Sequence, residues 1–220
     1  MKRSNYKPKD YFIEFFIVLL GITIAFWLSN LGDDWKERNL EKVYLKDIKS
    51  DLEEDLKSLD FSIKRNEQKL STLAKGIDHF QGKNNGVTLD TLVQYAELIG
   101  NYFHFSPNDY TYISLQQSGD FRIISSQELK NSLIELYKLY EFIKIEQDNV
   151  LSALDQNFYP ILMANYDMVT GTVVNPDYFN STIFRNNMGF TINEISTLIR
   201  LYSKAKKQIE FINEVQITLE

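Results

Sequence analysis

The sequence contains no cysteine and only two histidines, and it is poor in proline (4) and glycine (9) among its 220 residues. Without a thiol there is no disulfide, no thiolate nucleophile, no cysteine-ligated metal and no lipid-modified cysteine. His79 and His104 lie 25 residues apart with no carboxylate at ligand spacing, which argues against a zinc site. Nucleophile-elbow, metalloprotease and dinucleotide-binding motifs are missing as well. We therefore expect no catalytic residue, no cofactor, no metal ion and no enzymatic activity.

The chain is also short of positive charge, with 24 Lys and Arg against 30 Asp and Glu, for a net charge of −6. The acidic excess lies after residue 31, where 20 cationic side chains stand against 28 carboxylates. This sign argues against nucleic acid, and against an anionic membrane surface, as the main partner. The scarcity of helix-breaking residues, together with many Leu, Ile, Lys and Glu, predicts an all-α fold.

One long hydrophobic run contrasts with this polar composition. Residues 11–31, YFIEFFIVLLGITIAFWLSNL, contain a single charge, Glu14, and 21 residues at about 1.5 Å each match the roughly 30 Å core of a bilayer. Tyr11 at one end, and Trp27 and Trp35 at the other, are placed to anchor a helix at the two water interfaces. The run is longer than the apolar core of a signal peptide and lacks a small-x-small cleavage site. We predict an uncleaved transmembrane helix over residues 11–31 that crosses membrane lipid once.

The flanks of this run predict its orientation. Residues 1–10 carry four cationic side chains and one carboxylate, whereas the far side begins with Asp33 and Asp34. Because positively charged flanks stay in the cytoplasm, residues 1–10 are expected to form a cytoplasmic tail. The rest of the chain is then expected in the periplasm, outside the cell inner membrane.

Small side chains share one side of the predicted transmembrane helix with its carboxylate. This stripe comprises Glu14, Gly21, Ala25 and Ser29, which are 7, 4 and 4 residues apart, with Val18 beside them. Small residues let a second helix approach closely, so we interpret the stripe as an intramembrane packing surface for other transmembrane helices, in a membrane complex or a homo-oligomer. For Glu14, three roles stay open: helix packing, contact with headgroup water or Lys9, and proton transfer.

Beyond Gly32, a heptad-like pattern predicts one long stalk helix over residues 32–82. Its apolar seam is Leu45, Ile48, Leu52, Leu56, Leu59 and Ile63, continuing through Asn66 to Leu70, Leu73 and Ile77. The charged run from Lys46 to Asp55 is typical of a solvated helix face, and we assign it no binding role. A glycine-containing turn at residues 82–86 is expected to end this helix.

Residues 83–220 are predicted to form the remainder of an elongated up-and-down helical bundle, packed on the stalk helix. Four helices are expected: Thr88 to Tyr102; a short run from the Ser106-Pro107 start signal to Gly119; a capping box at Ser125 to near Pro160; and a capping box at Thr191 to the C-terminus. The third has a seam of Leu129, Leu133, Leu136, Tyr140 and Ile143, continuing through Gln147 to Val150, and a second apolar face of Ile134, Leu139, Phe142 and Ile145. This helix is therefore expected to lie centrally.

Two features of residues 83–220 each allow more than one interpretation. Arg122, between apolar residues, could bind an anion or pair with Asp120 or a neighbouring carboxylate at the edge of the bundle. Periodicity is lost over residues 163–189, where aromatic side chains gather at Tyr166, Tyr178, Phe179 and Phe184. They are expected to cover the core as lids or to line a ligand pocket.

Two groups of residues carry a resemblance to a known family. The first comprises Tyr11-Phe12-Ile13-Glu14-Phe15, Gly21-Ile22, Ala25-Phe26-Trp27-Leu28, Lys36-Glu37-Arg38 and Tyr44-Leu45; the second comprises Tyr112, Leu115, Ser118-Gly119 and Ile123-Ile124. In these residues, over roughly half of its length, the chain resembles a functionally uncharacterised family of small single-span envelope proteins from Gram-negative bacteria. The resemblance implies an envelope protein and no particular reaction, and it favours an interaction role for the face that carries Glu14.

These features together predict a single-pass inner-membrane protein with a periplasmic helical domain, acting as an accessory or structural subunit of a larger membrane protein complex. The alternative is a periplasmic ligand-binding sensor module. Such a module would have to signal through a partner subunit, because a cytoplasmic tail of ten residues cannot carry an output by itself. A small molecule bound near Tyr166 or Phe179 would favour the sensor.

Overall fold

The computed structural model of the chain describes residues 8–83 and 86–217, and the predicted all-α class is confirmed apart from one small hairpin. The helices are α1 (Pro8–Phe80), α2 (Leu89–Gly100), α3 (Tyr110–Ser118), α4 (Gln127–Ala153), α5 (Tyr159–Asn165) and α6 (Thr182–Ile217), with short 3-10 turns η1 (Asp120–Ile123) and η3 (Pro176–Asn180) and a π turn η2 (Leu154–Phe158). The hairpin pairs β1 (Tyr166–Asp167) with β2 (Thr172–Val173) in antiparallel register.

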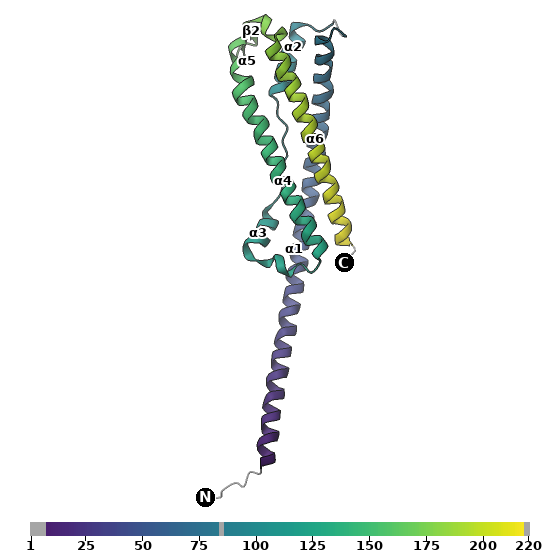
Figure 1. The fold of residues 1–220 in the computed structure, drawn as a ribbon, viewed down its shortest axis with the longest axis vertical. Coiled ribbons are helices and arrows are strands. Elements are labelled where there is room, and N and C mark those ends of the chain that lie inside the picture. Colours follow the sequence, from purple (N-terminus) through teal and green to yellow (C-terminus); the bar gives the residue numbers. More distant parts are fainter. Residues whose placement is uncertain (1–7, 84–85, 218–220) are drawn as a thin grey trace.

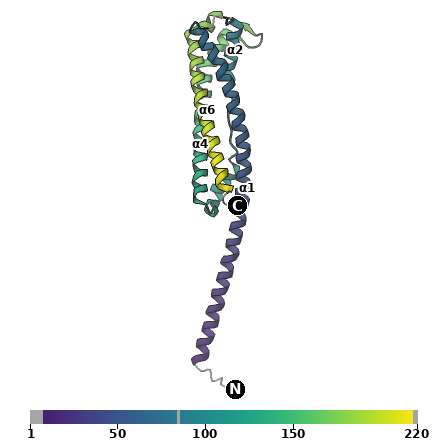
Figure 2. The same ribbon diagram turned by 90° about the vertical axis from the view of Figure 1, so that its right-hand side faces the viewer.

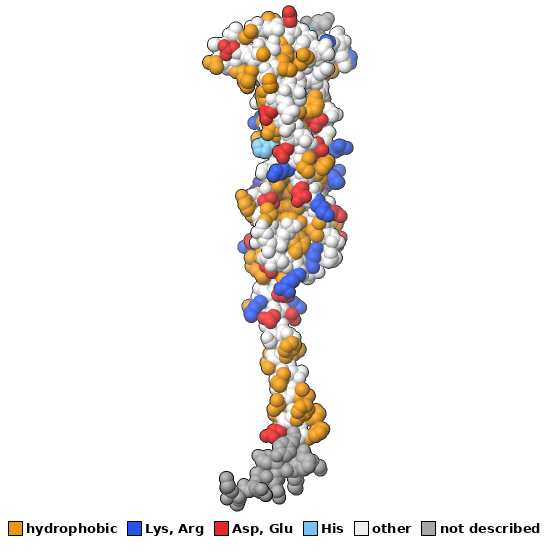
Figure 3. Space-filling model, turned by 60° about the vertical axis from the view of Figure 1, so that its left-hand side comes forward, with side chains coloured by type: hydrophobic (Ala, Val, Ile, Leu, Met, Phe, Trp, Pro, Cys, Tyr) orange, Lys and Arg blue, Asp and Glu red, His pale blue; other side chains and the backbone are white. Residues whose placement is uncertain are grey.

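Helix α1 is an unbroken helix of 73 residues that contains the predicted transmembrane helix and all of the predicted stalk helix except residues 81–82. Its only proline, Pro8, is its first residue, so nothing in its interior removes a backbone hydrogen bond. The N-terminal part of α1 projects alone from the rest of the molecule (Figure 1), and residues 12–40 are all exposed. Hydrophobic side chains cover most of the lower part of this projecting shaft, with one acidic group near its foot, and further charged side chains lie on its upper part (Figure 3).

The rest of the chain runs back and forth along the upper part of α1. α1 ascends to the end remote from the N-terminus, here called the distal end, where α2 follows it (Figures 1 and 2). Residues 101–109 then return as extended chain to α3 and η1, which lie where α1 enters the bundle. α4 ascends again, and α6 descends, so that the second of these four passes is only partly helical.

Helix α6 packs against both α1 and α4. The residues that recur every three to four positions along its inner side are buried: Ile195, Leu198, Tyr202, Ala205, Ile209 and Ile212. The prediction that α4 lies centrally is wrong, because Phe142 and Ile145 of its second apolar face are exposed. α1 and α6 approach closely at the distal end, where a Cβ on Gly76 would lie 2.8 Å from Met188 Sδ.

The serine that caps α4 is Ser126, one residue beyond the predicted Ser125. The Oγ of Ser126 accepts a hydrogen bond from the Leu129 amide at 3.2 Å and caps the helix. Ser125 was the wrong choice, because its amide and its hydroxyl both donate to Glu41 Oε1 of α1, at 2.5 and 2.8 Å. Arg122 also binds α1, pairing with Glu37 at 3.3 Å, and not Asp120.

Three other predicted boundaries are wrong. α3 begins at Tyr110 and not at Ser106, although Gly119 ends it with a φ of 77° as expected. α4 does not stop near Pro160; it continues through η2 into α5, where Pro160 occupies the first turn and its missing N–H is tolerated. α6 begins at Thr182, so Thr191 lies buried inside this helix and caps nothing.

The segment predicted as irregular, residues 163–189, is more regular than expected. It contains the end of α5, the β1–β2 hairpin, η3 and the start of α6. Tyr178, Phe179 and Phe184 are buried, with their rings 5.1 to 5.6 Å apart in edge-on contact, so these three aromatic residues form core.

Candidate functional site

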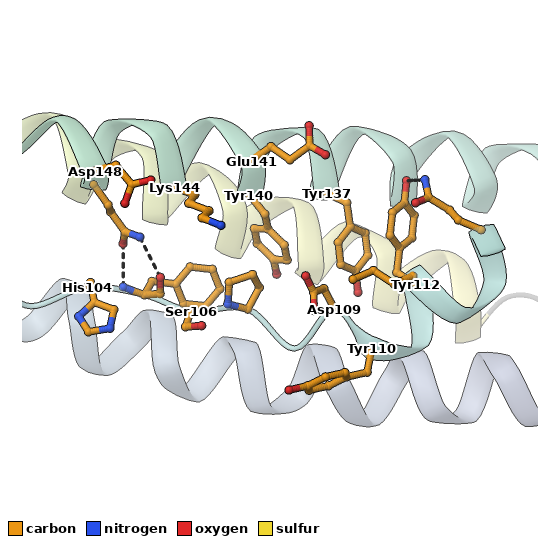
Figure 4. A pocket seen from close by; sticks show the side chains of 15 residues that line it. His104, Ser106, Asp109, Tyr110, Tyr112, Tyr137, Tyr140, Glu141, Lys144 and Asp148 are labelled. Atoms are coloured by element: carbon orange, nitrogen blue, oxygen red, sulfur yellow. Dashed lines mark hydrogen bonds between the residues drawn. The ribbon is translucent and has the colours of Figure 1, made fainter.

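An extended segment, residues 101–109, lies between α1 and α4 in the place where a bundle would have a helix (Figure 4). We call this segment the strap. A helix satisfies its own backbone hydrogen bonds, but an extended chain inside a bundle needs partners from elsewhere. The partners of the strap are polar side chains that occupy seam positions of the neighbouring helices.

Three polar side chains of α1 bind the distal half of the strap. Lys69 Nζ donates to the carbonyl oxygens of Ile99, near the end of α2, and of Asn101, the first residue of the strap, at 3.2 and 2.5 Å. Asn66 Nδ2 donates to the Phe103 carbonyl, and Ser62 Oγ to the His104 carbonyl, each at 3.2 Å. Positions 62, 66 and 69 are four and three residues apart, so they share one face of the helix.

Gln147 of α4 binds the middle of the strap. Its Nε2 donates to the Phe105 carbonyl at 3.0 Å, and its Oε1 accepts from the Phe105 amide at 2.8 Å (dashed lines in Figure 4). The same Oε1 accepts a third bond from the Tyr202 hydroxyl of α6 at 2.5 Å. All three residues are buried, so one amide side chain joins the strap, α4 and α6 within the core.

Asp55 of α1 binds the proximal end of the strap. Its Oδ1 accepts from the Asn108 amide, and its Oδ2 accepts from the Tyr140 hydroxyl of α4, both at 2.8 Å. The Asn108 carbonyl accepts from the Tyr137 hydroxyl at 3.3 Å. One turn before Asp55, Asp51 accepts from the Thr111 hydroxyl of α3 at 2.5 Å.

Burial perturbs the ionisable groups that hold the strap. Asp55 is fully buried, and desolvation of its carboxylate, reinforced by Asp51 and Asp109, raises its pKa from 3.8 to about 6 against the hydrogen bonds that lower it. Desolvation lowers the pKa of Lys69 to about 8. Burial and the nearby Asp55 carboxylate raise the pKa of both Tyr137 and Tyr140 far above the ordinary value of 10, so both hydroxyls stay donors at neutral pH.

A hollow of about 500 Å³ opens beside the strap, between it and α4 (Figure 4). Phe105, Tyr137 and Tyr140 form buried parts of its lining. Its ionisable residues are of both signs, namely His104, Asp109, Glu141, Lys144 and Asp148. Among the described residues, no group of three or more His, Cys, Asp or Glu side chains could hold a metal ion.

The residues predicted to act in the membrane lie far from the strap. Glu14, Val18, Gly21, Ala25 and Ser29 are all on the projecting part of α1, and no other element of the described chain covers them. A Cβ on Gly21 would meet nothing within 4 Å. Trp27 and Trp35 are exposed at 62% and 68%, whereas the side chain of the third predicted anchor, Tyr11, lies outside the described residues. The predicted tail is helical from Pro8, and residues 1–7 lie outside the described part.

Neither the strap nor most of the side chains that bind it were predicted from the sequence. Asp55 was wrongly placed on a solvated face, although it is one of the most buried residues of α1. The sequence did contain a signal, because four polar residues of α1 recur at the spacing of one helix face. Asp55, Ser62, Asn66 and Lys69 are 7, 4 and 3 residues apart. Such a stripe on a bundle-facing side indicates that something polar, here a backbone, lies opposite it.

The described chain thus belongs to a broad class, all-α proteins with a long apolar helix at the N-terminal end. By length and composition only, this helix is the one in the described residues that could cross a membrane. Residues 14–158 match the model of a family described as "Family of unknown function (DUF6090)", so the chain belongs to that family. The predicted membership of a family without an assigned activity is confirmed. No curated protein and no solved structure matches the chain.

Proposed function

We propose that the protein is a single-pass subunit of a Gram-negative inner membrane. In this proposal residues 11–31 cross the bilayer, residues 1–10 stay in the cytoplasm, and an up-and-down helical bundle stands in the periplasm. The protein acts as an accessory or structural subunit that associates with a larger membrane protein complex through its span. No chemical step is assigned to it.

The observation that carries this proposal is the complete exposure of the apolar part of α1. Phe12, Phe16, Phe26 and Trp27 are 52% to 69% exposed, and no other described element covers residues 12–31. An apolar surface this large is unfavourable in water, since monomeric soluble proteins rarely expose patches above a few hundred Å². Lipid or protein therefore has to cover it, and the length of the run fits a bilayer.

The stripe of small residues supports a protein neighbour within the membrane. Gly21, Ala25 and Ser29 leave a shallow strip on a helix whose other positions carry large side chains, and nothing in the described chain fills it. Lipid tails are as apolar as leucine, so helices associate in lipid mainly where their backbones can approach closely. Glu14 on the same side is costly in lipid and favourable against a polar partner group.

Affinity purification of the intact, tagged protein from native membranes, followed by mass spectrometry, tests the proposal. We expect a membrane protein partner, or further copies of this chain, to co-purify in mild detergent. The double variant Glu14→Leu with Gly21→Leu should lose this association. The matched control is Phe16→Leu with Thr23→Leu, which changes the opposite side of the helix at the same spacing and should retain the association. Equal association of both double variants would contradict the proposal.

A second candidate, a periplasmic sensor that signals through a partner subunit, is favoured by one hollow at the distal end. This hollow of about 400 Å³ is lined by Tyr166, Tyr159, Leu162 and Met168, together with Gly100 of α2. Its size and its mixed lining, in which Glu97 and Asn101 add polar groups to the apolar ones, fit a small molecule. Native mass spectrometry of the purified protein distinguishes the candidates, because a retained small molecule that is lost on Tyr166→Ala would favour the sensor.

A further inference from the structure

Asp55 is a carboxylate buried without a cation. Its exposed fraction is 0%, both of its oxygens accept hydrogen bonds from neutral donors, and no Lys, Arg or His of the described residues makes an ion pair with it. A buried charge without a counterion costs free energy that two neutral hydrogen bonds only partly offset. The feature does not depend on the membrane span.

The other elements packed around Asp55 bring no compensating positive charge. On α1 the carboxylate of Asp51 acts on Asp55, and Glu54 accepts from Asn108 Nδ2 of the strap at 3.0 Å; the strap itself adds the carboxylate of Asp109, its last residue. On α4 the neutral hydroxyls of Tyr137 and Tyr140 lie nearby, and Glu141 and Lys144 line the hollow beside the strap without forming an ion pair with Asp55. On α6, Lys206 pairs with Asp60 of α1 at 2.6 Å, and Glu210 also attracts this lysine.

We propose that the strap is a proton-linked latch, held more firmly between α1 and α4 when Asp55 is protonated and released more readily when Asp55 is ionised. The direction follows from linkage. With the strap in place, Asp55 is buried and its pKa is about 6; with the strap released, the carboxylate meets water and returns toward 3.8. The closed state thus binds the proton more tightly, so acidification favours closure over the range between these two values.

The strap connects the two ends of the domain, which gives its release a structural consequence. At its proximal end it continues into α3 and η1, and these contact the part of α1 that leaves the bundle. Tyr44 donates to Asp120 at 2.9 Å, and Arg122 of η1 pairs with Glu37 at 3.3 Å. Release of the strap would weaken these contacts with α1. The pH around the bundle would therefore change how firmly the lower part of α1 is held.

Hydrogen–deuterium exchange of the full chain in detergent tests the latch. The amides of Phe105 and Asn108, which the strap directs at Gln147 and Asp55, are followed from pH 7.5 to pH 5 and corrected for the intrinsic pH dependence of exchange. The pKa of Asp55 is about 6 with the strap in place and returns toward 3.8 with the strap released. Protection of these amides should therefore rise about tenfold as the pH falls from 7.5 to 5. Protection that is constant with pH would overturn the proposal.

Three variants separate the proton effect from a general loss of structure. Asp55→Asn keeps the shape and an acceptor but cannot titrate, so protection should become independent of pH. Tyr140→Phe removes a hydrogen bond that favours the ionised carboxylate, so the midpoint of the pH dependence should move to higher pH. Asp60→Asn, on the exposed side of the same helix, should retain the wild-type profile. A pH dependence that survives in Asp55→Asn, or an unmoved midpoint in Tyr140→Phe, would also refute the latch.

Discussion

Gln147 shows how much of this fold depends on single polar side chains. Its amide makes three hydrogen bonds to two other parts of the chain, the backbone of Phe105 and the hydroxyl of Tyr202, and all of these groups are buried. Inside a protein, such groups cost more when unpaired than their bonds contribute when formed. The strap therefore tolerates change at Gln147 poorly.

We expect Gln147→Leu to lower the free energy of unfolding by roughly 3 kcal/mol, because it leaves a buried N–H, a carbonyl and a hydroxyl without partners. Urea denaturation of the full chain in detergent, followed by circular dichroism, measures this loss. The control is Gln208→Leu, which removes one long bond of 3.4 Å to the Ser132 carbonyl and should cost less than about 1 kcal/mol. Equal losses in the two variants would show that the Gln147 network adds nothing to stability.

Some of these residues could be located from the sequence, but not their roles. Asn66 and Gln147 both interrupt apolar seams, so their burial follows from helical periodicity. What they bind does not follow, since the partner is the backbone of a segment that has no periodicity of its own. Asp55 was misplaced because it stands among charged neighbours whose other members, such as Glu53 and Glu54, do face water.

Helix ends are the elements where local sequence and tertiary contacts compete. Ser125 and Ser126 are both suitable capping residues, and the capping-box pattern with Glu128 favours Ser125. In the structure, Glu41 of α1 binds Ser125, and Ser126 becomes the cap. A tertiary contact thus moves the helix start by one residue.

The different roles of Ser125 and Ser126 can be tested by replacing each serine with alanine. Ser126→Ala should lower the free energy of unfolding by about 1 kcal/mol, since it removes the acceptor for the Leu129 amide. Ser125→Ala should cost less, because its amide still donates to Glu41 and only the exposed hydroxyl bond is lost. Thermal unfolding of both variants decides between the two serines, and a larger loss for Ser125→Ala would restore the capping-box interpretation.

The long elements were more predictable than the connections between them. The seam of α6 is buried, because a helix buries whichever face repeats an apolar residue every three to four positions. The predicted seam of α1 is correct only in part: Ile48, Leu52, Leu59 and Leu73 are buried, whereas Leu45, Leu56, Ile63, Leu70 and Ile77 are half-buried. The strap, the β1–β2 hairpin and the π turn could not be predicted in this way. Each depends on contacts with distant residues, such as the bond from Tyr159 to the Gly100 carbonyl, 59 positions away.

On the scale of the whole molecule, the two ends of the protein differ in what they expose. The N-terminal end exposes the apolar shaft of α1, and the distal end exposes the tip of the β1–β2 hairpin, where Val169 is 95% accessible. If the shaft lies in a bilayer, its charged N-terminal flank and this tip are on opposite sides of it. The orientation can therefore be tested at the two ends of the same molecule.

The absence of cysteine makes this test direct, because any introduced cysteine is the only thiol in the chain. We expect a membrane-impermeant maleimide to label Val169→Cys in intact cells whose outer membrane admits the reagent. Ser4→Cys should be labelled only after the inner membrane is permeabilised. The reverse pattern would place the bundle in the cytoplasm and contradict the orientation predicted from the flanking charges.

The unbroken course of α1 has a mechanical consequence. A helix kinks mainly at proline, at distortions of its hydrogen bonding or where another group inserts, and α1 has no proline after its first residue. From residue 31 to its end it rises about 75 Å, so tilting its lower segment by about 10° as a rigid rod would swing the far end sideways by about 13 Å. A partner helix that tilts the membrane segment of α1 would therefore displace the distal end of α1 much further than the segment itself.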